Sequence, residues 1–171
     1  ISIKAFSNSF EKVACGKKAE DFKWKTIQGD VVQLKEILKS NAVVLVVLRG
    51  WPGYQCPLCT KQVGGLIADA EEFSELKAVV VMVYPGPSAD LQAHAKEFSE
   101  DFNFPANFRF TLDPDYSMIN KYGLRWDAPK ETAYPSTFVI NKNGEIVYSK
   151  TSTTHGGRAD NEDIFEALGK L

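Results

Sequence analysis

The amino-acid sequence predicts an α/β fold built as a single domain. Two continuous apolar runs, Val43–Leu48 and Ala78–Tyr84, indicate strands that are buried on both faces, as strands sandwiched between helices are. Segments with helical apolar spacing follow these runs and start at Pro57 and Ser88. We therefore expect a central mixed β-sheet flanked by helices on both faces, with an N-terminal β-hairpin extension.

The first part of the chain is expected to contain an arm, a hairpin and a short helix. Asp21–Ile27 alternates apolar and polar residues, and Val31–Gln33 follows a Gln-Gly-Asp turn, which indicates a β-hairpin. Apolar residues then recur at helical spacing in Leu34–Leu38, so a short helix leads to the first buried strand. Residues 1–18 are assigned to an N-terminal arm and residues 19–171 to the domain.

The rest of the chain is expected to alternate helices with strands. Ser88 is predicted to be an N-cap, because a serine side chain can accept a hydrogen bond from an unpaired N–H of the first helical turn. Gly123 is predicted to close a brief helix, since glycine readily adopts the left-handed backbone that ends many helices. In order, the predicted elements are helices over Pro57–Phe73 and Ser88–Phe98, a strand over Phe108–Leu112, a helix over Tyr116–Tyr122, strands over Ser136–Ile140 and Glu145–Tyr148, and a helix over Asn161–Leu171.

Composition argues against several classes of protein. The net charge of −2 gives no sign of nucleic acid or an anionic membrane as an obligatory partner. The longest apolar run, Ala42–Leu48, is far too short to span a membrane. Three cysteines are too few for a disulfide-stapled secreted scaffold. The first twenty residues lack the apolar segment of a signal peptide, so a cytoplasmic location is expected, although the start at Ile1 leaves an extracytoplasmic one open.

The chemistry is expected at Cys56-Pro57-Leu58-Cys59. Cys56 falls just before a predicted helix, where unpaired N–H groups and the helix dipole favour an anion and lower the pKa of a thiol. Pro57 suits the first helical turn, where its missing N–H costs nothing. The two sulfurs are separated by one turn and can close a small disulfide loop, so the spacing predicts a reversible dithiol. Cys15 is interpreted as a bystander thiol.

Two other interpretations of the cysteine motif stay open. A C-x-x-C motif can form half of a zinc site, and the remaining candidate ligands are Cys15, His94 and His155. Those three residues do not have the spacing of a second ligand pair, and His94 is interpreted as a packing residue. A purely structural disulfide is the other interpretation, but so short a loop removes little entropy from the unfolded chain. We therefore predict a redox pair, with no cofactor and no metal.

Four segments, in their order and spacing, resemble a known family. They are Ala19–Phe22, Val43–Gly50 leading into Cys56, Leu112–Asp115 with Asn120–Gly123, and Pro135–Gly144. Over residues 19–171 the chain resembles the thioredoxin-like superfamily, and within it the redoxin branch. That branch comprises the AhpC/TSA, or peroxiredoxin-like, antioxidant proteins and their membrane-associated thiol-disulfide oxidoreductase relatives.

The resemblance implies roles for three residues. Cys56 is implied to be the attacking thiol, at the exposed helix end, and Cys59 the resolving one. Cys56 would attack a disulfide to give a mixed disulfide, or a peroxide to give a sulfenic acid, and Cys59 would release either product. Pro135 is implied to lie in a cis peptide bond that faces the cysteines.

The chain also departs from the family pattern. Peroxiredoxins resemble one another in a P-x-x-x-T-x-x-C motif, whereas here Arg49 and Gly53 stand at the proline and threonine positions before Cys56. Pro135 stands where peroxiredoxins generally carry an arginine that holds the thiolate and the peroxide. Arg49 is therefore a candidate for the missing charge, and a salt bridge at the strand end is the alternative role.

Further candidates surround this motif in the sequence. Trp51, Tyr54, Arg125 and Trp126 are candidates for the rim of a pocket, with ordinary packing as the alternative. The segment His155–Arg158 follows the last strand and could approach the site.

The favoured function is a thiol-dependent enzyme that reduces hydroperoxides through a Cys56/Cys59 cycle. The expected partners are a hydroperoxide and an external thiol donor such as thioredoxin or a small thiol. One alternative is a thioredoxin-like oxidoreductase that acts on protein disulfides. Another is a zinc-holding or binding module in which the cysteines are not redox active. A homodimer is left open.

Overall fold

A computed structural model describes residues 15–171 of the chain. Most of the predicted arm over residues 1–18 therefore lies outside the described residues, and the division into arm and domain stays a prediction. The described end of that arm joins the sheet: the N–H of Gly16 donates to the carbonyl of Ile146 at 2.7 Å, and Lys18 forms an isolated antiparallel bridge with Glu145.

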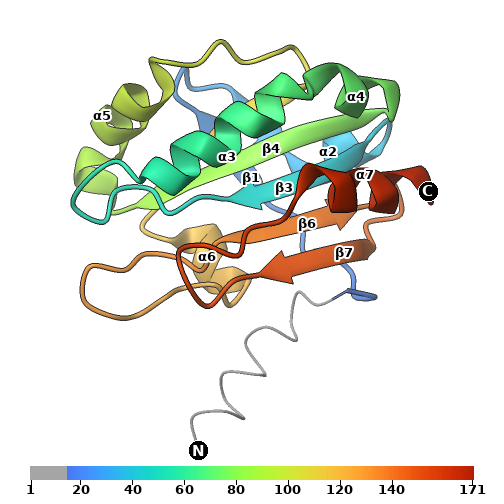
Figure 1. The fold of residues 1–171 in the computed structure, drawn as a ribbon. Coiled ribbons are helices and arrows are strands. Elements are labelled where there is room, and N and C mark those ends of the chain that lie inside the picture. Colours follow the sequence, from blue (N-terminus) through green and yellow to red (C-terminus); the bar gives the residue numbers. More distant parts are fainter. Residues whose placement is uncertain (1–14) are drawn as a thin grey trace, which may run out of the picture.

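Seven strands form one mixed sheet (Figure 1). The strands are β1 (Lys23–Thr26), β2 (Val31–Gln33), β3 (Ala42–Val47), β4 (Ala78–Gly86), β5 (Phe108–Pro114), β6 (Ser136–Ile140) and β7 (Ile146–Thr151). Their spatial order is β2-β1-β5-β4-β3-β6-β7. The central strands β3, β4 and β5 are parallel, and all other pairs are antiparallel. The predicted mixed sheet with its N-terminal hairpin is confirmed.

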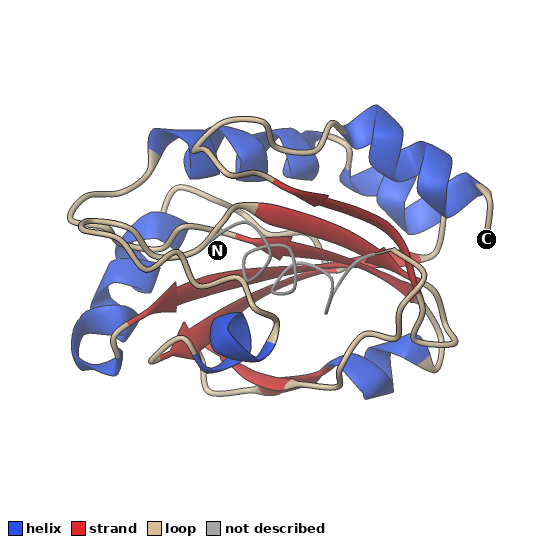
Figure 2. Ribbon diagram, turned by 90° about the horizontal axis from the view of Figure 1, so that it is seen from below, coloured by secondary structure: helices blue, strands red, loops and turns tan. Residues whose placement is uncertain are grey.

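Helices cover both faces of the sheet (Figure 2). They are α2 (Leu34–Leu38), α3 (Pro57–Ala68), α4 (Ala70–Glu75), α5 (Ser88–Ser99), α6 (Ser117–Lys121) and α7 (Asn161–Gly169). Side chains of α3, α4, α5 and α7 pack with Val44 and Val46 of β3, whereas those of α2 and α6 pack with Val43, Leu45 and Val47. Both faces of β3 are thus buried, which explains its unbroken apolar sequence. None of the helices described in residues 15–171 is long and apolar enough to cross a membrane.

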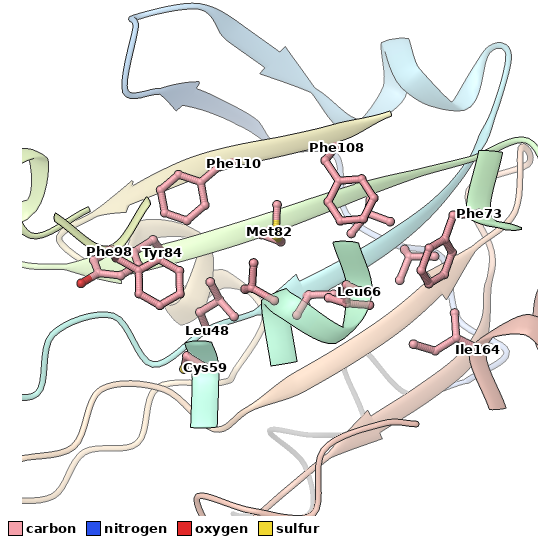
Figure 3. Packing of buried hydrophobic residues seen from close by; sticks show 14 of the residues in the cluster. Leu48, Cys59, Leu66, Phe73, Met82, Tyr84, Phe98, Phe108, Phe110 and Ile164 are labelled. Carbon is pink, nitrogen blue, oxygen red and sulfur yellow. The ribbon is translucent and has the colours of Figure 1, made fainter. Parts of the chain in front are cut away.

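The α3 side of the sheet holds an aromatic and aliphatic core (Figure 3). Leu66 of α3 and Phe73 of α4 are buried against this side together with Met82 of β4 and Phe108 of β5. Burying a side chain of this size contributes about 1.5–3 kcal/mol. Cys59, at the start of α3, belongs to the same cluster, so the core fixes the position of its sulfur.

Gly50 follows β3 and lies against Pro85 of β4. Its φ of +73° is in the left-handed region, and a Cβ there would lie 2.0 Å from the carbonyl oxygen of Pro85. No larger residue fits without moving the backbone of one of the two segments. The loop from Arg49 to Gln55 therefore starts from a fixed point at the C-terminal end of β3.

Two helix predictions need correction. The single helix expected over Pro57–Phe73 is broken at Asp69, whose backbone has φ −104° and ψ 19° and whose carboxylate accepts a hydrogen bond from Asn161 at 2.7 Å. Ser88 is the first residue of α5 rather than its N-cap, and its N–H donates to the carboxylate of Asp115 at 2.9 Å. In each case the hydrogen-bond partner at the helix boundary is a residue distant in sequence.

The expected cis peptide bond before Pro135 is also wrong. Among residues 15–171 every peptide bond is trans. The trans form is the lower-energy isomer of an X–Pro bond. In this trans form the backbone groups on either side of the bond have hydrogen-bond partners. The carbonyl of Pro135 accepts the N–H of Ser152 at 2.9 Å, and the N–H of Tyr134 donates to Leu124 at 2.9 Å.

Candidate active site

The two cysteines of the motif lie together at the N-terminus of α3. Cys56 is the N-cap residue with an extended backbone, Pro57 is the first helical residue, and Cys59 lies one turn further on, as predicted. Both are free thiols, and the Cys59 thiol donates a hydrogen bond to the Cys56 sulfur. A helix N-terminus presents N–H groups and a partial positive charge to that sulfur.

Both sulfurs are covered, which contradicts the expectation of an exposed Cys56. Cys56 is 2% exposed and Cys59 is 1% exposed. Both cysteines belong to the apolar cluster on the α3 side, and two arginine side chains, Arg49 and Arg158, have guanidinium groups within hydrogen-bonding range of the Cys56 sulfur. The sulfur is thus shielded from solvent while remaining next to two cationic groups.

Arg49 combines the two roles that the sequence left as alternatives. Its Nη1 lies 3.9 Å from the Cys56 sulfur and donates to the Tyr54 hydroxyl at 3.1 Å. Its Nη2 forms an ion pair of 3.1 Å with the Glu131 carboxylate. The guanidinium is therefore at once a neighbour of the sulfur and a partner in a buried ion pair.

Arg158 contacts both sulfurs from the opposite end of the chain. Its Nη1 donates to Cys59 Sγ at 3.3 Å and to Gln62 Oε1 at 2.7 Å, and its Nη2 lies 3.8 Å from Cys56 Sγ. Its Nε donates to the carbonyl of His155 at 3.0 Å. The segment His155–Arg158 thus reaches the site, and Arg158 belongs with the candidate residues.

The two thiols have opposite acidities. The hydrogen bond from Cys59, the N–H of Cys59 and the Arg49 guanidinium lower the pKa of Cys56 far below its ordinary value, although burial opposes them. The pKa of Cys59 is raised well above its ordinary value, because Cys59 shares its hydrogen with Cys56 and is buried. At neutral pH the pair is accordingly a Cys56 thiolate held by a Cys59 thiol.

The loop before Cys56 is fastened to α5. The Gln55 side chain donates to the carbonyl of His94 at 2.8 Å and to the Glu97 carboxylate at 3.0 Å, and it accepts the Tyr84 hydroxyl at 2.8 Å. The Trp51 ring stacks on His94 with 4.2 Å between ring centroids. These contacts hold the residue next to the thiolate in one place.

The other predicted rim residues lie around the site in different roles. Trp126 stacks on Tyr134 at 4.8 Å, which is ordinary packing of the loop. Arg125 donates to the carbonyls of Glu131 and Thr132 at 3.1 and 2.7 Å, so it holds the backbone that carries Glu131. Pro135 is buried directly before β6, whose first residue, Ser136, pairs with Val47 at the end of β3.

Glu131 is the residue that the sequence analysis missed. Its carboxylate accepts Arg49 Nη2 at 3.1 Å and lies 2.8 Å from His155 Nε2. It is 82 positions from Arg49 and sits in no recognisable motif, so no local signal identifies it.

The described residues do not provide a metal site. Within residues 15–171, no three His, Cys, Asp or Glu side chains gather at one point as ligands of an ion. Zinc sites in proteins use three or four such ligands, so metal analysis of the purified protein remains the test of the zinc interpretation.

The sequence profile of the AhpC/TSA family matches residues 15–149. A putative peroxiredoxin bcp of Helicobacter pylori is 34% identical to the chain over 141 residues, which cover 80% of the chain and 86% of the relative. The chain belongs to the AhpC/TSA family. As expected, this AhpC/TSA protein is a thiol-dependent oxidoreductase of the peroxiredoxin-like branch. The peroxiredoxin Bcp of Bacillus subtilis is 28% identical, with 79% of this chain and 83% of the relative covered.

Solved structures confirm the thioredoxin-like fold of this AhpC/TSA protein. The peroxidoxin BcpB of Mycobacterium tuberculosis superposes with a TM-score of 0.70 at 20% identity, covering 92% of this chain and 97% of that one. A putative thiol:disulfide interchange protein DsbE from Chlorobium tepidum superposes with a TM-score of 0.68 at 23% identity, covering 92% and 99%. The fold is thus common to peroxide-related and disulfide-related proteins, so the activity must be argued from the site.

Proposed function

We propose that this AhpC/TSA protein reduces hydroperoxides through a Cys56/Cys59 dithiol–disulfide cycle and is recharged by an external thiol. The observation that carries the proposal is the pairing of a Cys56 thiolate with the Cys59 thiol at the N-terminus of α3. The thiolate is the nucleophilic form of cysteine, and the second thiol is one helical turn away. The peroxiredoxin names of the relatives support the same activity.

In the first step the Cys56 thiolate attacks the terminal oxygen of the hydroperoxide. The O–O bond breaks, the alkoxide leaves and takes a proton from water, and Cys56 becomes a sulfenic acid. Arg49 Nη1, which lies 3.9 Å from the sulfur, is placed to donate to a peroxide oxygen. A fixed donor at that position stabilises the negative charge that develops as the O–O bond breaks.

In the second step the Cys59 sulfur attacks the sulfenic sulfur of Cys56. The S–O bond breaks, and the leaving hydroxide takes the proton of Cys59 to form water. A disulfide between Cys56 and Cys59 remains. Two thiol groups of the donor, from thioredoxin or from small thiols, then reduce it and become a disulfide themselves.

The second candidate function is reduction of protein disulfides. The C-x-x-C motif and the proline in place of the usual arginine favour it. The burial of Cys56 argues against it, because a sulfur of the bulky protein disulfide must come within bonding distance of a Cys56 sulfur whose residue is 2% exposed. A small hydroperoxide needs much less space, so we rank peroxide reduction first.

Mass spectrometry after one equivalent of hydrogen peroxide tests the proposal. The Cys59→Ser variant is expected to retain a sulfenic acid at Cys56, and the Cys56→Ser variant none. Peroxide consumption with thioredoxin or dithiothreitol should depend on Cys56, while insulin reduction should stay at background. Insulin reduction without peroxide consumption would instead establish the second candidate function.

The identity of the donor, a cytoplasmic location and a homodimer stay predictions. The donor can be identified by comparing recycling rates with thioredoxin and with a small thiol. Size-exclusion chromatography with light scattering tests the homodimer.

A further inference from the structure

The Cys59 sulfur accepts two hydrogen bonds although it is the protonated member of the pair. The backbone N–H of Arg49 donates to Cys59 Sγ at 3.3 Å, and Nη1 of Arg158 donates to the same sulfur at 3.3 Å. A protonated thiol is a weak acceptor, whereas a thiolate is a strong one. The two donors are therefore best suited to a state in which Cys59 carries negative charge.

That state arises after the peroxide has reacted. In the reduced protein, the hydrogen bond that Cys59 donates to the Cys56 thiolate raises the pKa of Cys59. Conversion of Cys56 to a sulfenic acid removes the negative charge of Cys56. The cationic Arg158 and the Arg49 N–H then remain beside Cys59 and favour its thiolate.

We propose that Arg158 is a catalytic residue of the disulfide-forming step, in which its guanidinium stabilises the Cys59 thiolate that attacks Cys56. This inference rests on the proposed peroxidase function and deepens it. Cys59 first releases its proton to water. As the new S–S bond then forms, the S–O bond of the sulfenic acid breaks, and the leaving hydroxide takes up a proton from water and departs as water. The hydroperoxide is the oxidant of the preceding step.

The charge of Arg158 is available for this role, unlike that of Arg49. The Arg49 guanidinium shares its charge with the Glu131 carboxylate in an ion pair of 3.1 Å. Within residues 15–171 Arg158 has no carboxylate partner, since its side chain bonds the neutral Gln62 amide, a carbonyl oxygen and the sulfurs. A cation without a carboxylate partner attracts a thiolate more strongly than one that is already paired.

The backbone before Arg158 also fixes the guanidinium in place. Gly157 has a φ of +67°, and a Cβ there would lie 3.0 Å from the Ser152 hydroxyl oxygen. The hydroxyl of Ser152 accepts the N–H of Thr154 at 3.1 Å and so closes the turn after β7. The turn places Arg158, and the bonds of its guanidinium to the His155 carbonyl and the Gln62 amide direct it toward the sulfurs.

Rapid mixing with one equivalent of hydrogen peroxide tests the role in two phases. The first phase, sulfenic acid formation, is followed by trapping with dimedone, and the second by loss of free thiol as the disulfide closes. We expect Arg158→Gln to slow the second phase by about tenfold or more, the loss typical of a charge-assisted hydrogen bond. The first phase should change much less, because Arg49 and the Cys59 hydrogen bond still keep Cys56 ionised. Excess peroxide should then produce more sulfinic acid at Cys56.

The pH dependence separates catalysis from a structural effect. In Arg158→Gln the second phase should accelerate as pH rises, because a Cys59 thiol that has lost its cationic neighbour needs a higher pH to form the attacking thiolate. The wild type should depend on pH less steeply. Arg158→Lys keeps the positive charge but loses the planar guanidinium with its paired N–H donors, so it should give an intermediate rate. Arg109→Gln is the matched control, since within residues 15–171 the Arg109 guanidinium bonds only the backbone carbonyls of Ala106 and Phe108, near the start of β5.

Three outcomes decide the inference. A second phase of wild-type rate in Arg158→Gln overturns it, and so does an equal slowing of both phases that high pH does not reverse. A slowed second phase that high pH restores supports it. If the wild-type protein forms neither sulfenic acid nor disulfide with peroxide, the proposed function itself fails, and that failure is recognisable because it needs no variant. Thermal unfolding of each variant verifies that the fold is intact.

Discussion

Arg49 and Glu131 form an ion pair of 3.1 Å between Nη2 and Oε2, and their side chains are only 2% and 14% exposed. The pair joins the end of β3 to the loop before β6. Its carboxylate also contacts His155 Nε2 at 2.8 Å, so Glu131 connects two loops to the arginine beside Cys56. The Nε of Arg49 has no hydrogen-bond partner among the described residues, which leaves the two terminal nitrogens to set the orientation of the guanidinium.

Glu131→Ala is predicted to destabilise the protein by about 3 kcal/mol, because removing one member of a buried ion pair leaves the other charge unpaired. Glu131→Gln should cost less, since an amide oxygen can still accept from Arg49. Urea denaturation provides the measurement. Glu36→Ala is the control: its ion pair with Lys39 is surface-exposed, and its loss should cost under about 1 kcal/mol. Equal losses in the two alanine variants would show that the Arg49–Glu131 pair contributes no more than a surface pair.

Arg49→Lys is predicted to slow the oxidation of Cys56 by about 10²-fold, the effect of removing one donor from a site of developing charge. A lysine keeps the charge, but it cannot reach Glu131, Tyr54 and the sulfur at once as the guanidinium does. Competition for hydrogen peroxide against a reference peroxidase measures the rate. Arg109→Lys should match the wild type, and an unchanged rate in Arg49→Lys would remove Arg49 from the reaction.

The lowered pKa of Cys56 predicts that the thiolate persists well below pH 7. The thiolate absorbance at 240 nm, taken as the difference from Cys56→Ser, should be flat around neutral pH and fall as pH drops through the lowered pKa. Folding lowers this pKa, so the thiolate stabilises the reduced fold above about pH 8.5, the unfolded value, and that stabilisation is lost toward acid pH. Cys59→Ala should move the midpoint upward, because it removes the largest cause of the shift. A midpoint near 8.5 in the wild type would contradict the assignment.

Gly50→Ala and Gly64→Ala are predicted to change stability in opposite directions. A Cβ at position 50 would lie 2.0 Å from the Pro85 oxygen on a left-handed backbone, so the alanine should cost more than about 2 kcal/mol and displace Arg49. At position 64, inside α3, a Cβ meets nothing within 4 Å, and alanine should stabilise the helix by up to about 1 kcal/mol. Thermal unfolding of both variants tests the pair. Stabilisation by Gly50→Ala would mean that the loop does not pack on β4 as described.

The strands, most helices and the N-cap position of Cys56 could be predicted from the sequence, because they depend on local apolar spacing and on the glycines and prolines that end helices and strands. The sequence was insufficient where a distant residue decides. Asp69, at the break between α3 and α4, accepts a hydrogen bond from Asn161, and the first N–H of α5 donates to Asp115. Neither partner leaves a signal near the element that it changes.

The residues of the site also fall into those that are close in sequence and those that are distant. Cys56, Cys59 and Arg49 are close in sequence, so their proximity could be predicted. Arg158 reaches the cysteines, and Glu131 reaches Arg49, only through the tertiary fold. Their contacts place two guanidinium groups beside Cys56, which is buried rather than exposed. Exposure depends on what packs over a residue, which no local motif records.

The attachment of the Arg49–Gln55 loop to α5 has a kinetic consequence. We expect recharging by a bulky reductant to depend on how frequently this loop is released from α5, because the loop carries Arg49, which lies beside Cys56. That frequency depends on the Trp51–His94 stack and on the hydrogen bonds of Gln55. Changes on the outer surface of α5, which never touch a sulfur atom, would therefore adjust how fast the enzyme is recharged while leaving its response to peroxide intact.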